Sequence, residues 1–410
     1  MLELRLAYRN ILRQKRRSLL TGISMAGGFA LCTFSFCLLE GGWGNAVDIF
    51  TLDHTGHIQI HSNDYHRRPK IHKTIGERES IEQILTNHQE ITAFAPRVYA
   101  PALAYANNQT RAVRVVGVDW KLEPTTSRLR QKVHAGDYLD NAMTSDGYAK
   151  AMIGAGVANT LDIGIGDELV LISQGADGSI ANDIVMITAL VGTRTSWDKM
   201  NVYLPLPAAQ SFLSMGNRVH EYALQVADSN ANEVVARSLQ TEINHINPAI
   251  TVSTWQVVEE SFYRTMQSDK QGNYFTMVLI VFLVFIGVLN TVLMSILERT
   301  REFGVIRAIG SRPIAIIRLI FLETIILATL SIAAGVVIVT PALYWLLTTG
   351  FTLPTPIEFG GVTFDHLTGR LSLFVLTVPA LLIYVFAALV SILPGIRAAR
   401  ITPQQAMASH

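Results

Sequence analysis

The sequence predicts a membrane protein with four transmembrane α-helices and a large α+β extracytoplasmic domain between the first and second helices. Of its 410 residues, 50% are hydrophobic and only 16% are charged, whereas soluble domains carry about a quarter charged residues. The apolar excess lies in four runs, each long enough for the roughly 20 residues that cross a bilayer core. The segment between the first two runs has the scattered charges of a water-soluble protein.

The apolar runs and the segments between them predict the organisation of the chain. The first run is longer than the hydrophobic core of a signal peptide, and no A-x-A site closes it, so we interpret it as a retained anchor. The predicted parts are an interfacial helix (1–17), the first span (18–40), the extracytoplasmic domain (41–272), the second span (273–297), a short cytoplasmic helix (298–313), the third span (314–347), an extracytoplasmic loop (348–370), the fourth span (371–393) and a cytoplasmic tail (394–410).

Basic residues flanking the spans predict the orientation, because short cytoplasmic segments carry the excess of Lys and Arg. The loop between spans three and four has only Arg370. Both termini and the segment between spans two and three are therefore predicted to be cytoplasmic. The net charge of +1 does not indicate the excess of basic residues that a nucleic-acid partner would require. The basic residues on the predicted cytoplasmic side are Arg5, Arg9, Arg13, Lys15, Arg16, Arg17, Arg299, Arg301, Arg307, Arg312, Arg397 and Arg400.

The segment before the first span has the pattern of an amphipathic helix lying in the inner-leaflet interface, in contact with membrane lipid. A plain basic flank without helical order is the alternative. The apolar face would hold Leu4, Tyr8, Ile11 and Leu12, and the basic face Arg5, Arg9, Arg13 and Arg16.

Two features inside the spans concern helix packing. Gly22, Ala26 and Ala30 repeat every four positions, and such a stripe lets another helix approach closely. A span of the same chain and a span of a partner are both open as the neighbour. Glu323 is an acid within the third span, where an unpaired charge is costly. We expect it to pair with Arg318, or with a polar group near the cytoplasmic surface, rather than to carry protons or substrate.

The extracytoplasmic segment alternates strand and helix patterns, which predicts a mixed α+β domain. Walker A, H-E-x-x-H and G-x-S-x-G motifs are all missing from the sequence, so we expect no catalytic residue and no nucleotide cofactor on this chain. The histidines 54, 57, 61, 66 and 72 do not predict a metal site, because His57 and His61 lie too far apart along a strand to chelate one ion. Predicted strands are 57–61, 113–118, 168–172, 184–191 and 222–226; predicted helices are 81–87, 208–214 and 231–246.

Four sequence motifs resemble those of the FtsX/MacB-like permease family, which includes the lipoprotein-releasing LolC/LolE subunits. Residues 290–310 read NTVLMSILERTREFGVIRAIG, and residues 393–403 read LPGIRAARITP. In the extracytoplasmic segment, residues 153–167 read IGAGVANTLDIGIGD and residues 202–206 read VYLPL. Together these motifs extend the resemblance over essentially the whole chain, and the stretch from Glu298 to Gly310 is the most specific of them.

The resemblance implies a non-catalytic permease in the bacterial inner membrane, with a MacB-like periplasmic core domain. Such permeases form dimers with an identical or homologous permease, and each one sits on a cytoplasmic ABC ATPase that binds ATP and Mg²⁺. A coupling helix after the second span docks on that ATPase. Arg299, Phe303 and Arg307 share one face of this helix, while Glu298 and Arg301 have the spacing of an ion pair. The coupling residues that the resemblance implies are Glu298, Arg299, Arg301, Glu302, Phe303, Gly304, Arg307 and Gly310.

The resemblance also implies a function of the mechanotransmission type (type VII), in which ATPase closure moves the spans and the periplasmic domain. The expected cargo is a lipoprotein or another amphiphile, with a periplasmic carrier or lipoprotein as a further partner. Two alternatives remain: export of a peptide, an antibiotic or a haem-like molecule, and ATP-driven activation of a cell-wall hydrolase. A secondary transporter is disfavoured, because four spans with Glu323 alone provide no buried relay of charges.

Overall fold

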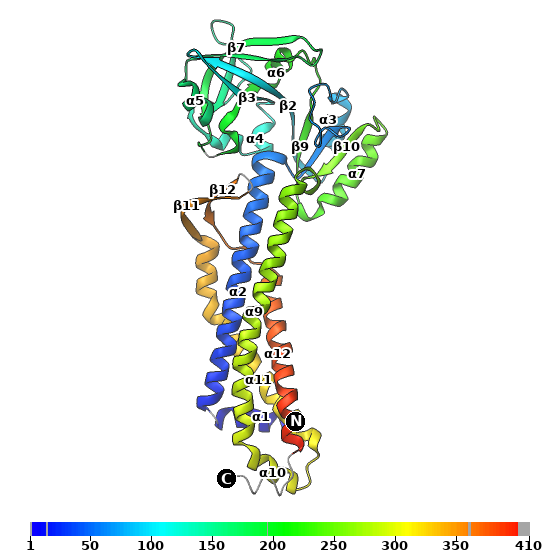
Figure 1. The fold of residues 1–410 in the computed structure, drawn as a ribbon. Helices are drawn as coiled ribbons and strands as arrows, with labels where there is room; N and C mark the ends of the chain where they lie inside the picture. The colour runs from blue at the N-terminus through cyan, green and yellow to red at the C-terminus, as the bar shows by residue number, and fades with distance from the viewer. Residues whose placement is uncertain (1, 14, 195, 360–361, 401–410) are drawn as a thin grey trace. The chain divides into compact units, whose positions relative to one another are not determined.

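The computed structural model describes residues 2–13, 15–194, 196–359 and 362–400 (Figure 1). These residues divide between two compact units. We call Met1–Asn45, Met266–Pro354 and His366–His410 the helical unit, and Ala46–Thr265 and Thr355–Asp365 the sheet unit.

The helical unit is built from long helices that run side by side (Figure 1). The part of the chain that the structure describes has four helices long and apolar enough to span a membrane, at Ser18–Thr55, Glu260–Asn290, Pro313–Thr348 and Leu373–Ile392. Each predicted span overlaps one of them. The helices of this unit are α1 (Leu2–Arg13), α2 (Lys15–Phe50), α9 (Glu260–Glu298), α10 (Thr300–Ala308), α11 (Pro313–Thr348) and α12 (Leu373–Arg400).

Helices α2 and α9 are longer than the spans predicted at 18–40 and 273–297. Helix α2 continues to Phe50, and α9 begins at Glu260, so each contributes residues to both units. Hydropathy does not predict these extensions, because they contain polar residues. The backbone there is helical, but these residues lie outside the apolar runs. The consequence is that one unbroken helix joins each end of the sheet unit's sequence to a predicted span.

The sheet unit contains a βαββαβ subdomain made by the two ends of its sequence. Its strands lie in the order β10-β1-β9-β2, and all neighbouring pairs are antiparallel. Apolar side chains of α3 and α7, such as Leu85 and Leu239, are buried in the same core as these strands. The elements are β1 (Ile58–Ser62), α3 (Arg78–Asn87), β2 (Ile91–Ala106), β9 (Glu221–Val226), α7 (Asn232–Asn244) and β10 (Ile250–Thr254).

Between β2 and β9 the chain inserts a second subdomain whose strand pairings close a ring. The ring runs β2-β3-β8-β5-β7-β6 and returns to β2, and only the pairs β3–β8 and β5–β7 are parallel. Strand β2 is shared, since its first half pairs with β9 and its second half with β3. The further elements are β3 (Gln109–Val118), α4 (Glu123–Thr126), β4 (Val133–Gly136), β5 (Ala149–Gly154), α5 (Ala155–Leu161), β6 (Glu168–Gln174), β7 (Ile180–Val191), β8 (Asn201–Pro205), α6 (Leu206–Phe212) and α8 (Trp255–Val258).

All five strands and all three helices predicted in this domain are present, so the mixed α+β prediction is confirmed. Strand β2 was missed, although it is the longest strand described. Its Ala-rich sequence contains Pro96 and Pro101, residues that argue against a central strand. Residues 348–370, predicted as a loop, contain a two-stranded sheet of β11 (Phe351–Phe359) and β12 (Val362–Leu367).

Candidate functional site

The predicted coupling segment folds as a short helix between two long ones. Helix α9 ends at Glu298, α10 covers Thr300–Ala308, and α11 begins at Pro313. Gly310 has φ +99°, a left-handed backbone that favours glycine and ends the helix. Gly304 is buried. The side chains predicted to form the docking face or its ion pair, those of Glu298, Arg301, Phe303 and Arg307, lie outside the described side chains.

Arg299 does not present its side chain for docking, contrary to the face predicted for it with Phe303 and Arg307. Its side chain is 7% exposed. Nε donates to Glu302 at 3.0 Å, and Nη1 donates to Glu323 at 2.7 Å. The cation of Arg299 thereby joins the start of the coupling segment to α11. The sequence could not show this, because Glu323 is distant in the chain.

Glu323 is paired with Arg299 and Asn10 rather than with Arg318. Asn10 Nδ2 donates to Glu323 Oε1 at 2.5 Å. Positions 318 and 323 point about 140° apart around one α-helix, so a contact along α11 is unfavourable. Arg13 of α1 also forms an ion pair with Glu302. We call Asn10, Arg13, Arg299, Glu302 and Glu323 the polar network of the helical unit; it links α1, α9, α10 and α11.

The small residues predicted as a packing stripe lie against α11 of the same chain. A Cβ added to Gly335 of α11 would lie 2.8 Å from Phe29 Cδ1 and 3.0 Å from the Ala26 carbonyl oxygen. A Cβ added to Gly22 would lie 3.5 Å from Ser331 Oγ. Ala30 is half-buried against the core that contains Phe29 and Val339. Close approach of α2 and α11 therefore depends on small residues on both helices.

In the sheet unit, the ends of α2 and α9 meet through aromatic side chains. Phe50, the last residue of α2, stacks on Phe262 near the start of α9, with ring centroids 4.3 Å apart. Trp197 meets the Phe50 ring edge-on at 5.9 Å, and Trp255 lies 6.4 Å from the Phe262 ring. Phe50, Phe262 and Trp255 are all buried. Aromatic pairs of this geometry add to the apolar burial that holds the two helix ends together.

A π-helical turn at Thr51–Thr55 continues α2, and the sheet unit supplies donors for its last carbonyl groups. Helix ends leave such carbonyls without intrahelical partners. The Arg128 amide donates to Leu52 O at 3.0 Å, and Gln59 Nε2 donates to Thr55 O at 2.8 Å. Arg97 Nη1 donates to His54 O at 2.5 Å. The end of the long helix is thus hydrogen-bonded to three separate segments of the sheet unit.

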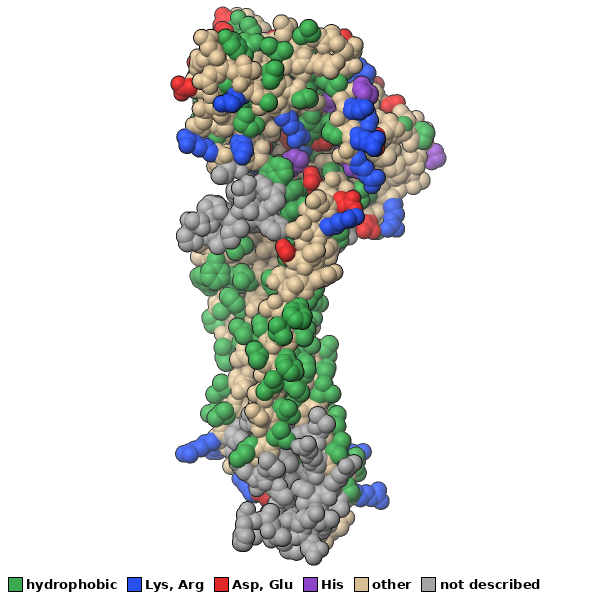
Figure 2. All heavy atoms as spheres, in the orientation of Figure 1, with side chains coloured by type: hydrophobic (Ala, Val, Ile, Leu, Met, Phe, Trp, Pro, Cys, Tyr) green, Lys and Arg blue, Asp and Glu red, His purple; other side chains and the backbone are tan. Residues whose placement is uncertain are grey.

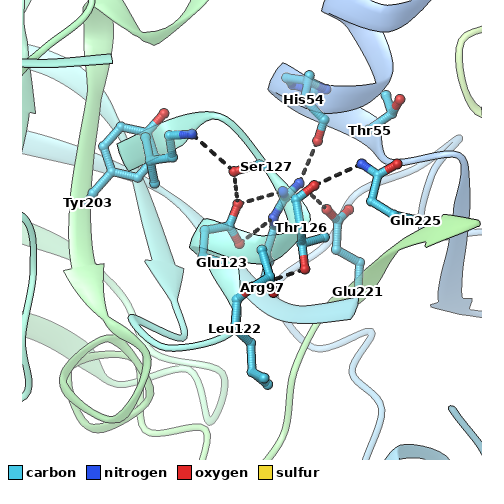
Figure 3. A network of polar contacts seen from close by, with 12 residues as sticks. His54, Thr55, Arg97, Leu122, Glu123, Thr126, Ser127, Tyr203, Glu221 and Gln225 are labelled. Carbon is cyan, nitrogen blue, oxygen red and sulfur yellow. Dashed lines mark hydrogen bonds and ion pairs between the residues drawn. The ribbon is translucent and has the colours of Figure 1, made fainter. Parts of the chain in front are cut away.

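Arg97 belongs to a buried ion network between β2, α4 and β9 (Figure 3). It donates to both carboxylate oxygens of Glu123, at 3.0 and 2.6 Å, and lies 3.7 Å from Glu221. Ser127 Oγ donates to Glu123 at 2.6 Å, and Tyr99 Oη donates to Glu221 at 2.7 Å. In a bidentate pair of this kind the opposite charges are in contact, and two parallel N–H groups donate to the two carboxylate oxygens.

The charges of this network are mutually stabilised despite burial. Burial by itself raises the pKa of Glu221, but its interactions with His61 and Arg97 and the hydrogen bond from Tyr99 lower it to about 2. Burial opposes the charge of Arg97, yet Glu123, Tyr99 and Glu221 raise its pKa well above the ordinary value. Sequence reasoning missed these residues, because they come from segments far apart in the chain and form no short motif.

The histidines are distributed among different contacts. His57 Nδ1 accepts from the Val226 amide at 3.2 Å, and His61 Nε2 lies 3.6 Å from Glu221. Within the described residues, no three His, Cys, Asp or Glu side chains are grouped as metal ligands.

Two family models together cover most of the chain. The model of the MacB-like periplasmic core domain matches residues 18–242, more than half of the sequence. The model of the FtsX-like permease C-terminal region matches residues 274–403. The chain therefore belongs to the family of FtsX-like permeases with a MacB-like periplasmic core domain. It is a permease component of an ABC transporter of the MacB/LolE type, and permeases of this type work with a cytoplasmic ABC ATPase.

Curated relatives agree with this family. The lipoprotein-releasing system transmembrane protein LolE of Haemophilus influenzae is 24% identical over 370 residues, which cover 86% of this chain and 85% of LolE. The macrolide export ATP-binding/permease protein MacB 2 of Aeromonas hydrophila is 22% identical over 81% of this chain, which spans about half (51%) of that relative. The crystal structure of the periplasmic region of MacB from Actinobacillus actinomycetemcomitans aligns with 50% of this chain and 92% of its own, at 10% identity and a TM-score of 0.38.

Proposed function

We propose that this chain is a mechanotransmitting permease that couples a separate cytoplasmic ATPase to extraction or export of a lipoprotein or another amphiphile. The relative named for lipoprotein release covers nearly the whole chain, which favours this cargo class. The ATPase would bind ATP and Mg²⁺, and this chain would bind neither. The permease would lie in the bacterial inner membrane with both termini cytoplasmic, paired with an identical or homologous permease.

The observation that carries the proposal is the continuity of α2 and α9. Each is one helix from a predicted span into the sheet unit, where Phe50 and Phe262 are stacked and Arg97 holds the end of the helix. At its other end α9 leads directly into Arg299 and α10. A helix with an unbroken hydrogen-bond ladder transmits displacement along its axis better than a loop, which would absorb it. Movement of α10 on an ATPase would thus reach the sheet unit.

Replacing Phe303 and Arg307 together by Asp tests the coupling assignment. Removal of an aromatic anchor and reversal of a charge at an interface centre costs several kcal/mol, or roughly a hundredfold or more in affinity. We expect the double variant to lose co-purification with its ATPase, or to leave ATP hydrolysis uncoupled from export, while insertion into the membrane is normal.

Arg9→Asp is the matched control, because it makes the same charge reversal at an exposed position of α1. It should retain the ATPase. If the Phe303/Arg307 variant binds the ATPase and exports as the unmodified protein does, residues 298–313 are a topology-setting segment and the coupling assignment is overturned.

Small-molecule export is the second candidate. The relatives named as macrolide export proteins favour it. A cargo comparison in vesicles, with an acylated lipoprotein and a macrolide as competing substrates, distinguishes the two functions.

A further inference from the structure

A cleft of about 520 Å³ lies in the sheet unit where the βαββαβ subdomain meets the ring of strands. Its size is within the range of small-molecule sites. Its lining includes Tyr99 of β2, Arg114 of β3, and Tyr65 and Lys70 from the loop after β1. His61 of β1 also lines it.

The cleft is bordered by basic side chains, of which Lys70 and Arg114 line it directly. Residues 66–73 read HRRPKIHK, and Figure 2 shows Lys, Arg and His side chains gathered on this face of the domain. Lys73 pairs with Asp64 at 2.5 Å. Among the described ion pairs, none involves Lys70 or Arg114, and both side chains are exposed. Arg114 lies over the Tyr99 ring with Cζ 4.1 Å from the ring centroid, which is a cation–π contact.

Two acids, Glu221 and Glu259, line the same cleft. Glu221 is already engaged by Tyr99 and lies near Arg97 and His61. Burial raises the pKa of Glu259, and the charge of Arg114 opposes that shift. Lys70 and Arg114 are the exposed charges of this lining, whereas Glu221 is buried and Glu259 is half-buried.

Buried polar atoms beside the cations lack partners. His61 Nδ1 and both ring nitrogens of His66 are buried with no hydrogen bond among the described residues. Buried polar atoms usually have a partner, so each such atom calls for an explanation. The remaining walls are apolar and include Ile71, Pro101 and Val113. A ligand that fits must combine hydrogen-bonding oxygens and negative charge with an apolar body.

We propose that this cleft binds the phosphate-bearing end of an amphiphile, held by Lys70 and Arg114 with the apolar part against Ile71 and Val113. This deepens the proposed function by naming a cargo chemistry and rests on it for the role of the cleft in export. Binding itself can be measured without the ATPase. A failure of this inference is therefore distinguishable from a failure of the coupling assignment.

The test measures binding of three probes to the full chain in a non-ionic maltoside detergent by titration calorimetry. The probes are hexyl phosphate, inorganic phosphate and hexyltrimethylammonium. We expect hexyl phosphate to bind, inorganic phosphate to bind at least tenfold more weakly, and the cation not to bind. Equal binding of the two phosphates would overturn the amphiphile assignment, and binding of the cation as strongly as hexyl phosphate would overturn the anion site.

Variants assign the binding to the cleft. Lys70→Met with Arg114→Met should weaken hexyl phosphate binding roughly tenfold or more, because two charge-assisted contacts are removed. Lys70→Arg with Arg114→Lys keeps both charges and should retain most of the affinity. Arg111→Met with Lys121→Met removes two exposed charges outside the cleft and should change nothing. An equal loss in this control pair, or no loss in the first pair, overturns the proposal.

Discussion

At the scale of single residues, Arg97 has the most consequential contacts in the sheet unit. It is 4% exposed and connects the carbonyl end of the π-helical turn to Glu123 and Glu221. A buried ion pair adds little net stability when complete, but removing one partner strands the other charge. Arg97 therefore fixes the position of the end of α2. Any other arrangement would leave a buried charge unpaired, which costs free energy.

Replacing Arg97 by Met should destabilise the sheet unit by about 3–5 kcal/mol, because Glu123 is left buried without its cation. Thermal unfolding of the full chain in detergent, followed by tryptophan fluorescence, measures this. Arg111→Met, at an exposed position, should change stability by less than about 0.5 kcal/mol. The double variant Arg97→Met with Glu123→Leu should lose less stability than Arg97→Met alone, because no carboxylate at position 123 is then left unpaired. A single variant as stable as the Arg111 control would contradict the assignment.

His220 should make stability depend on pH. Its side chain is fully buried, Nδ1 accepts from the Tyr99 amide at 3.0 Å, and Nε2 lies 2.9 Å from the Ile71 carbonyl oxygen, so the neutral ring is satisfied. Burial lowers its pKa below the ordinary value near 6.5. A lowered pKa gives stability that is complete above about 6.5 and is lost as pH falls below it.

The measurement is the difference in unfolding temperature between the unmodified chain and His220→Gln from pH 8 to pH 5. We expect the unfolding temperature of the unmodified chain to exceed that of the variant by less as pH falls. The reason is that only the unmodified chain gains a proton on the imidazole of residue 220 when it unfolds. A difference that stays constant over this range would exclude His220 as the titrating group.

Among the helices, the polar network of the helical unit links α10 to its neighbours α1, α9 and α11. Arg299 at the end of α9 is held by Glu323 of α11 and Glu302 of α10, and α1 adds Asn10 and Arg13. Side chains of Arg299 and Glu323 are only 7% and 15% exposed. Ion pairs removed from water in this way persist only when well paired, so these elements should move together.

Glu323→Gln should therefore reduce export several-fold while the ATPase still co-purifies, because the docking face of α10 is left intact. The ratio of ATP hydrolysed to cargo exported in vesicles is the informative measurement. Arg318→Met changes an exposed residue of α11 that has no ion pair among the described residues and should behave as the unmodified chain. An unaltered ratio in Glu323→Gln would exclude the network from transmission.

At the scale of the whole molecule, the orientation predicted from Lys and Arg can be tested directly. The native cysteines, Cys32 and Cys37, are buried and free, and both are replaced by Ala. A cysteine at Asp177 should then react with an impermeant thiol reagent in intact spheroplasts, and one at Ser311 should react only after lysis. The reverse labelling pattern would invert the predicted topology.

Much of the fold was predictable because its signals are local. Hydropathy predicts the four apolar helices, and alternation predicts strands such as β7, since burial of one face leaves a period of two in the sequence. Strand β2 was missed because Pro96 and Pro101 contradict local propensity. Tertiary pairing with β9, β3 and β6 outweighs that propensity.

The class of protein can be predicted from contiguous residues, because the four apolar helices, the mixed α+β domain and the permease motifs are all local signals. Which charged side chains come into contact depends on the three-dimensional fold. Glu323 pairs with Asn10 and Arg299 rather than Arg318, and Arg97 meets Glu123 and Glu221. The reason is physical: a buried ion pair depends on distance and desolvation in space, and residues far apart in the chain carry no periodic signal of such contacts.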